Sequence, residues 1–259
     1  MKPIIICGYS NTGKTSFIER LIKSIKSKGK TVAVIKHIDI SHKPKLDDSD
    51  TSRYLKAGAE LSIGFGGDYL LRYEKNIEKK AKENNSMRYM IHNLLLSANK
   101  DFVIIEGLKS YNGPIPKIVF VNSKEEIDSL ADELTIGYSG QNAEDFNISI
   151  PYIHFNADDE TLYRFIDKNS IPFVADLDCG ECGYPTCRDF AKALMRKEVT
   201  LKNCIPMSGY VKLTVNNKPV FLKGFVRDIL RDIVIGFAKN LHDYEEGDIK
   251  ISIRRPGLD

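Results

Sequence analysis

The first thirty residues contain a phosphate-loop pattern in the context that such a loop requires. The stretch from Gly8 to Thr15, G-Y-S-N-T-G-K-T, matches G-x-x-x-x-G-K-[ST] at every fixed position. An apolar run typical of a buried strand precedes it at 3–7, and an amphipathic helical pattern follows at 15–29. Strand, glycine-bounded loop and helix in this order form the start of a β-α-β unit. The sequence therefore predicts a P-loop fold that binds a nucleotide.

The next residues continue this alternation of strand and helix patterns. We expect a hairpin over 60–73 that turns at 66–68. Further strands are expected at 31–37, 101–107, 115–121, 133–139 and 150–156. Further helices are expected at 51–59, 74–99 and 159–169. This alternation predicts an α/β fold class, in which helices cover a mainly parallel sheet.

The pattern changes near residue 170. A cysteine-rich segment with its helix comes first, followed by a polar hairpin that turns near Asn216 and Asn217. An amphipathic helix over 225–241 and an alternating strand over 248–255 complete the chain. We expect the apolar stripe of that helix to belong to a core; its members are Phe225, Val226, Ile229, Leu230, Ile233 and Phe237. The predicted domains are 1–170, of P-loop type, and 171–259, a small α+β domain.

Composition limits the classes of partner. The net charge is only +3 with a pI near 8.4, which gives no argument for nucleic acid. No apolar run approaches the length of about 18 residues that a membrane span needs. The N-terminal apolar stretch is too short for a signal peptide. We therefore expect a cytoplasmic protein with neither a nucleic-acid nor a membrane partner.

Each fixed position of the loop has a chemical reason. Successive backbone N–H groups converge on phosphate oxygens, and the following helix adds its positive dipole end. Gly8 and Gly13 let the backbone approach the ligand closely because they lack a Cβ. Lys14 is expected to reach the β- and γ-phosphate oxygens, and the Thr15 hydroxyl to ligate Mg²⁺.

Three further positions are candidates for the same site. Glu106 ends the strand pattern at 101–107 and is suited to orient the magnesium water, as a P-loop acid does. Lys36 and His37 end another strand, at the edge where α/β sheets place ligands. Asp50 could approach the metal or the attacking water, although a plain helix cap explains it equally well. For His37 and His42 we favour an ordinary polar role over a dedicated metal site.

Four of the five cysteines form one group. Cys179, Cys182, Cys187 and Cys204 have the spacing C-x2-C-x4-C-x16-C, whereas Cys7 lies in the first apolar strand and is expected to be a core residue. In a chain without an export signal, such a group indicates metal ligands before disulfides. Three thiolates on a tight loop and one remote thiolate can cover the corners of a cubane cluster. Structural zinc and free thiols remain the alternatives.

Residues 1 to about 165 resemble the molybdopterin-guanine dinucleotide biosynthesis protein B (MobB) family. The resemblance rests on the phosphate loop, on Lys36-His37, on D-T-S-R-Y-L-K-A-G-A over 50–59 and on E-G-L-K over 106–109. Asn11 departs from the family, which usually has glycine there. Because asparagine tolerates the left-handed backbone conformation better than most residues, we expect the loop to keep its shape.

The resemblance implies a slow, typically homodimeric GTPase that helps a transferase to join GMP from GTP to molybdopterin. By this resemblance Thr15 and Glu106 serve Mg²⁺, Lys14, Asp50 and Glu106 act in hydrolysis, and Lys36 and His37 line the nucleotide site. The residues implied to contact the GTP phosphates are Gly8, Tyr9, Ser10, Asn11, Thr12, Gly13, Lys14, Thr15 and Ser16.

The cysteine segment resembles the small [4Fe-4S] domain of corrinoid iron–sulfur proteins and of membrane redox-complex B subunits. It shares their C-G-x-C-G-x-x-x-C-x-x-F-A pattern, with C-I-P in place of the usual final C-P. Together the two resemblances imply a GTP-binding accessory factor of molybdenum or tungsten cofactor maturation, acting on a guanylyltransferase or a molybdoenzyme. The alternatives are a metallochaperone or cluster-maturation NTPase, and a non-enzymatic adaptor between an electron donor and a molybdoenzyme.

Overall fold

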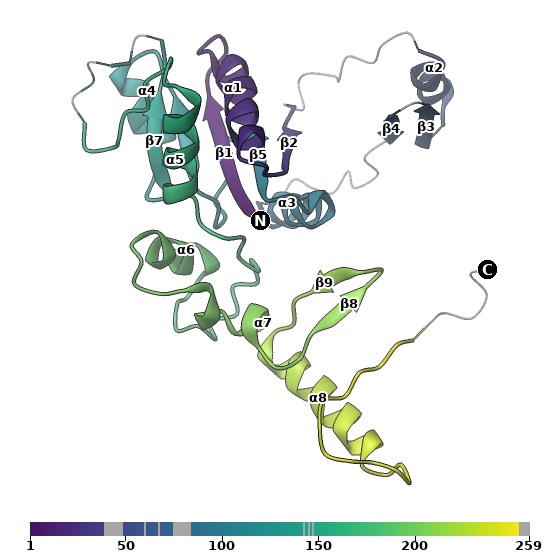
Figure 1. Ribbon diagram of the computed structural model, residues 1–259. Helices are drawn as coiled ribbons and strands as arrows, with labels where there is room; N and C mark the ends of the chain where they lie inside the picture. Colours follow the sequence, from purple (N-terminus) through teal and green to yellow (C-terminus); the bar gives the residue numbers. More distant parts are fainter. Residues whose placement is uncertain are drawn as a thin grey trace. The chain divides into compact units, whose positions relative to one another are not determined.

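The computed structural model describes residues 1–38, 49–59, 61–66, 68–74, 84–141, 143–144, 146 and 148–253. The chain divides into two compact units, Met1–Phe173 (unit 1) and Val174–Asp259 (unit 2). Each unit has its own secondary structure (Figure 1). Within the described residues, no helix combines the length and apolarity needed to cross a bilayer.

Unit 1 is built around a parallel sheet of five strands in the order β2-β5-β1-β6-β7. The strands are β1 (Lys2–Gly8), β2 (Val32–Lys36), β5 (Phe102–Glu106), β6 (Lys117–Phe120) and β7 (Thr135–Ser139). All four neighbouring pairs run parallel, which confirms the predicted α/β class. In the middle, β1 is fully buried from Ile4 to Ile6, where each isoleucine contributes about 1.5–3 kcal/mol of hydrophobic stabilisation.

Helices accompany this sheet in unit 1. They are α1 (Lys14–Ser27), α3 (Asn84–Ala98), α4 (Lys124–Leu130) and α5 (Asp159–Asn169), of which α1 packs against α5. The predicted stripe of α1 is largely buried, including Phe17, Leu21 and Ile25. The Phe17 ring meets Phe120 of β6 edge to face at 4.9 Å between centroids. This packing fixes where α1 begins, directly after the phosphate loop.

The remaining part of unit 1 is α2 (Asp50–Ala57) with an antiparallel hairpin, β3 (Leu61–Gly66) and β4 (Tyr69–Glu74). The hairpin confirms the prediction for 60–73. The helix predicted over 74–99 is confirmed over 84–98 as α3 and is wrong at Glu74, which ends β4; 75–83 lies outside the described residues, as does His42.

Two strand predictions fail over described residues, and two helices were missed, α4 and the short α7 (Ile205–Ser208) of unit 2. Residues 150–156 make only a single bridge, Tyr138 to Tyr152, because Pro151 has no N–H to continue a ladder. Residues 248–253 form no strand. The longer of the two, α4, follows an extended Ser123 N-cap residue.

Unit 2 consists of short elements. They are α6 (Cys187–Met195), a 3₁₀ turn η1 (Leu201–Asn203), α7 (Ile205–Ser208), β8 (Leu213–Val215), β9 (Lys218–Val220) and α8 (Gly224–Ala238). The predicted hairpin is confirmed by β8 and β9. Asn216 and Asn217 both have positive φ, 51° and 61°, as a type I′ turn requires.

The core prediction for the last helix is wrong. Phe225 and Phe237 of α8 are 79% and 65% exposed, whereas Arg227 of the same helix is buried. The reason is an ion pair: Arg227 Nη1 lies 2.6 Å from Glu181 Oε2, so the charged side of α8 faces its unit. The apolar stripe therefore faces outward.

Candidate functional site

The phosphate loop occupies the carboxyl end of β1 and leads directly into α1. In the sheet register Ile6 is paired with Glu106, and Lys36 is also paired with Glu106. Parallel strands end at the same edge, so this register gathers the ends of β1, β2 and β5 around the loop. The edge brings together four predicted site residues, Gly8, Lys36, His37 and Glu106.

The two loop glycines are required by the backbone. Gly13 has φ +87°, and a Cβ added there would meet the Phe155 ring at 2.5 Å. Gly8 has φ +152°, and its Cβ would meet the Phe120 carbonyl oxygen at 2.2 Å. Asn11 adopts φ +62°, the left-handed conformation expected where the family usually has glycine.

We expect Gly13→Ala to destabilise unit 1 by about 2–4 kcal/mol, because left-handed strain and a ring clash add together. Gly29→Ala is the matched control, since Gly29 also has positive φ, +68°, but nothing lies within 4 Å of the added Cβ. Urea unfolding of both variants separates strain from clash. Equal losses of stability in the two variants would contradict the contact with Phe155.

Lys14 lies folded over the loop. Its ammonium donates hydrogen bonds to the Tyr9 carbonyl and, at 3.1 Å, to Thr12 Oγ1. The Thr12 hydroxyl is buried and donates to the same carbonyl at 3.0 Å. Burial lowers the pKa of Lys14, while the nearby Glu106 carboxylate acts in the opposite direction. The lysine is thus held at the loop by acceptors that phosphate oxygens can replace. Thr15 and Ser16 open α1 and are exposed.

Glu106 lies at the carboxyl end of β5, with its side chain 14% exposed and its Oε1 3.2 Å from Lys36 Nζ. The His37 N–H donates to the Glu106 carbonyl at 2.9 Å, which places His37 beside the same strand end. Asp50 behaves differently, because it opens α2 and pairs with Arg53 at 3.2 Å. The structure joins Lys36, His37 and Glu106 but pairs Asp50 within its own helix.

Lys109 is a site residue that our sequence analysis did not single out. Its ammonium lies 4.1 Å from the centroid of the Tyr9 ring in the phosphate loop. Leu108 precedes it with φ +58°, a conformation that costs a bulky residue about 1–2 kcal/mol. The resemblance over 106–109 was the available signal, but a left-handed leucine cannot be read from sequence. Lys109 also lowers the pKa of Lys14, so the two charges are neighbours.

We expect Lys109→Met to weaken triphosphate binding about fivefold, the effect of losing roughly 1 kcal/mol of attraction near the surface. The loss should shrink in high salt because exposed charges are screened. Titration of a fluorescent GTP analogue at two salt concentrations measures both effects. If the variant kept full affinity at low salt, Lys109 would contact the Tyr9 ring without attracting the triphosphate.

The four clustered cysteines lie in unit 2, three of them at or before the start of α6 and one after that helix. Cys179 and Cys182 are half-buried in a loop whose Gly180 and Gly183 have φ +75° and +86°. Cys187 is the first residue of α6, and Cys204 stands between η1 and α7. The last two thiols are buried.

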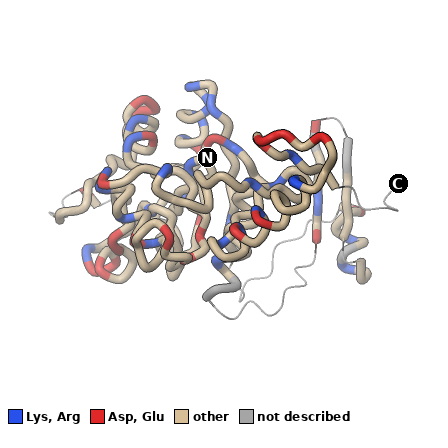
Figure 2. The backbone as a smooth tube through the Cα atoms, turned by 90° about the horizontal axis from the view of Figure 1, so that it is seen from below, with Lys and Arg blue, Asp and Glu red and all other residues tan. Residues whose placement is uncertain are grey.

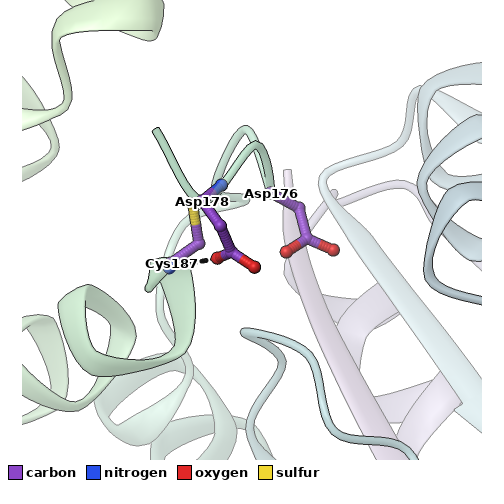
Figure 3. A group of neighbouring side chains, drawn as sticks. All are labelled: Asp176, Asp178 and Cys187. Carbon is purple, nitrogen blue, oxygen red and sulfur yellow. Dashed lines mark hydrogen bonds between the residues drawn. The ribbon is translucent and has the colours of Figure 1, made fainter. Parts of the chain in front are cut away.

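Two aspartates surround the Cys187 thiol (Figure 3). Asp178 accepts a hydrogen bond from the Cys187 N–H at 2.6 Å, and its own N–H donates to Cys187 Sγ at 3.3 Å. Oxygen atoms of Asp176 and Asp178 lie within 4.8 Å of that sulfur and of each other. Burial and then these two charges raise the pKa of Cys187 to about 12, although the N–H bond from Asp178 opposes the shift. Asp178 therefore ties the thiol to the start of the cysteine loop.

The spacing of the thiols bears on which metal group they fit. Burial raises the pKa of Cys204, and the thiols of Cys182 and Cys179 raise it further, so both lie in the neighbourhood of Cys204. Among the described residues, however, no three cysteine thiols lie within 4.8 Å of one another. A tetrahedral zinc site requires sulfurs about 3.8 Å apart. The four cysteines offer the thiolate ligands that either a zinc ion or an iron–sulfur cluster takes.

Cys7 belongs to the core as expected. It is fully buried in β1, and this burial raises its pKa to about 11.

Charges of both signs are interspersed along the described chain (Figure 2).

Comparison with known proteins finds a similar family for each of the two regions. A family model described as "Molybdopterin guanine dinucleotide synthesis protein B" (MobB) matches residues 4–136, and one described as "Putative Fe-S cluster" matches residues 176–206. The crystal structure of Bacillus subtilis MobB shares the fold of unit 1, with a TM-score of 0.51 and 24% identity, covering 64% of this chain and 94% of its own.

Two curated relatives extend the comparison. The "Putative molybdopterin-guanine dinucleotide biosynthesis adapter protein" of Methanocaldococcus jannaschii is 31% identical over 248 residues, covering 93% of this chain and 92% of its own length. The "Probable molybdopterin-guanine dinucleotide biosynthesis adapter protein" of Bacillus subtilis is 28% identical over 169 residues, covering 63% of this chain and 91% of its own length. The family model covers residues 4–136, and the Methanocaldococcus relative matches this chain over almost the whole length of both proteins. The chain therefore belongs to the MobB family.

Proposed function

We propose that this chain is a GTP- and Mg²⁺-binding adapter of molybdopterin-guanine dinucleotide biosynthesis that hydrolyses GTP slowly and carries an iron–sulfur cluster in unit 2. The observation that carries the proposal is the loop at the carboxyl end of β1. There Lys14 is held by the Tyr9 carbonyl and Thr12, ready to exchange these acceptors for phosphate. Backbone N–H groups at the start of α1 supply the remaining attraction for the anion.

The magnesium ion would be held by Thr15 and served by Glu106. The Thr15 hydroxyl is exposed at the first turn of α1, and Glu106 is largely covered, which suits a carboxylate that holds a metal-bound water. In the free protein Lys36 neutralises Glu106 across 3.2 Å. Magnesium would replace that partner and release Lys36 toward the phosphates.

The group in unit 2 is proposed to be a [4Fe-4S] cluster held by Cys179, Cys182, Cys187 and Cys204. Support comes from the sequence spacing of the four cysteines, three close together and one remote, and from the family match over 176–206. The Asp178 N–H directed at Cys187 Sγ is the kind of bond that tunes cluster sulfurs. When bound, the cluster would supply a fixed cross-link of unit 2 and a capacity for one-electron exchange.

The adapter role follows from the relatives, both of which are named as molybdopterin-guanine dinucleotide biosynthesis adapter proteins. The partner that fits is the transferase that joins GMP to molybdopterin, because both proteins would handle the same nucleotide. We therefore propose that unit 1 binds GTP and that the transferase is the protein to which the nucleotide is passed.

Titration of the anaerobically purified chain with a fluorescent GTP analogue tests this function. We expect Mg²⁺-dependent binding that unlabelled GTP displaces at least tenfold better than ATP. Adding the chain to a molybdopterin guanylyltransferase should raise the yield of the dinucleotide. Equal displacement by ATP would refute the GTP preference, and an unchanged yield would refute the adapter role.

A further inference from the structure

Helix α8 presents an apolar face that the described residues of unit 2 leave uncovered. The face consists of five side chains that are 41–79% exposed: Phe225, Val226, Ile229, Ile233 and Phe237. With a full burial of about 150–250 Å² for a phenylalanine, the face amounts to about 400 Å² of apolar area. The largest apolar patch of a typical monomer lies in this range and is often functional.

Directed bonds hold α8 with this face outward. Glu181, from the loop between Cys179 and Cys182, accepts a hydrogen bond from the Gly224 N–H at 2.5 Å and pairs with Arg227 at 2.6 Å. One turn further along, Arg231 Nη1 donates to the Tyr210 hydroxyl at 2.9 Å. The polar side of α8 is therefore anchored, and turning the helix over would break these bonds.

The charges of α8 argue against a lipid surface as the occupant. Arg227 is paired with Glu181, and Arg231 is paired with Asp232 at 2.6 Å. An interfacial helix needs an excess of basic side chains for anionic lipids, and here the arginines are balanced by carboxylates.

The order of the side chains fits a second copy of the same helix. Phe225 and Phe237 are equally far from position 231, and so are Ile229 and Ile233. In an antiparallel pair with a two-fold axis at the level of residue 231, phenylalanine would meet phenylalanine and isoleucine would meet isoleucine. Val226 would meet Gly236, where nothing lies within 4 Å of an added Cβ. At 3.6 residues per turn the Arg231 side chain points away from this face, as its bonds to Tyr210 and Asp232 require.

We propose that the apolar face of α8 is a self-association surface, at which two copies of this chain pair their α8 helices antiparallel. The surface lies outside residues 4–136 that match the MobB family, and the proposal does not depend on nucleotide binding. Two such faces bury about 800 Å² before their surroundings are counted, which is below the about 1,200–2,000 Å² of stable interfaces and in the range of weak, transient contacts. The pairing is therefore concentration-dependent.

Photo-crosslinking in the anaerobically purified full chain tests the pairing. p-Benzoylphenylalanine is placed at position 225, and ¹⁴N- and ¹⁵N-labelled chains are mixed before irradiation. We expect mixed-isotope cross-links between residue 225 and the segment around Phe237 of the other copy. Placing the probe at Tyr89, an exposed aromatic of unit 1, controls for random collisions.

Ile233→Glu should reduce these mixed-isotope cross-links at least tenfold, because it buries a charge at the centre of the pair. The site is 64% exposed, so the variant should fold, and Lys239→Glu, at the exposed residue just after the end of α8, controls for the added charge. Cross-links confined to one isotope would mean that the face is covered by the same chain and would overturn the proposal. The absence of mixed-isotope cross-links in the unsubstituted protein would overturn it equally.

Discussion

Lys14→Ala is expected to abolish measurable GTP binding, with a loss of affinity of at least about 100-fold. The ammonium is the one loop cation positioned to donate two charge-assisted hydrogen bonds to phosphate oxygens, each contributing about 1.5–3 kcal/mol. In the free protein those bonds go to the Tyr9 carbonyl and Thr12 Oγ1. Alanine offers no substitute, and bound GTP would leave its β- and γ-oxygens without that partner.

The measurement is a fluorescence titration with a GTP analogue and Mg²⁺. Lys23→Ala is the matched control, because Lys23 is an exposed lysine on the same helix, α1. It should bind GTP as the unsubstituted chain does. If Lys14→Ala kept the affinity of the Lys23→Ala control, the phosphate site would have to lie elsewhere and the proposed function would fail.

The loop was predictable because its determinants are local. A strand run, two glycines and an amphipathic helix specify Gly8–Ser16 within about twenty residues of chain. The approach of Lys36 and Glu106 was also predictable, since parallel strands end at one edge. The same local reasoning could have found α4, because Ser123 and Glu126 have capping-box spacing; in the structure the Glu126 carboxylate accepts from the Asn122 N–H at 2.7 Å.

Features that depend on contacts between residues far apart in the sequence could not be predicted. The position of Lys109 depends on the left-handed backbone of Leu108, a strain that no local preference favours. The orientation of α8 depends on Glu181, which lies 46 residues before Arg227. Periodicity shows that a helix has an apolar side, but only these long-range partners decide which side faces the unit.

The second large effect concerns the cysteines. Cys204→Ala should lower the iron content of the anaerobically purified chain from about four atoms to below one, because a cubane needs a thiolate at each corner. Cys204 is 4% exposed and is the only one of the four that lies beyond α6. Its loss also removes the cross-link between the loop and α7, and since metal binding stabilises the fold that holds it, unit 2 should unfold at a lower temperature.

Iron and sulfide analysis, with the visible absorption of the cluster, measures the loss, and Cys7→Ala supplies the matched control. Cys7 is equally buried but belongs to β1 of unit 1, so its removal should leave the iron content unchanged while reducing stability. The outcome separates the candidate metals as well. One tightly held zinc and no sulfide in the unsubstituted chain would contradict the cluster. A full iron content in Cys204→Ala would instead assign the fourth ligand to another residue, with the carboxylates beside Cys187 as the nearest oxygen donors to test.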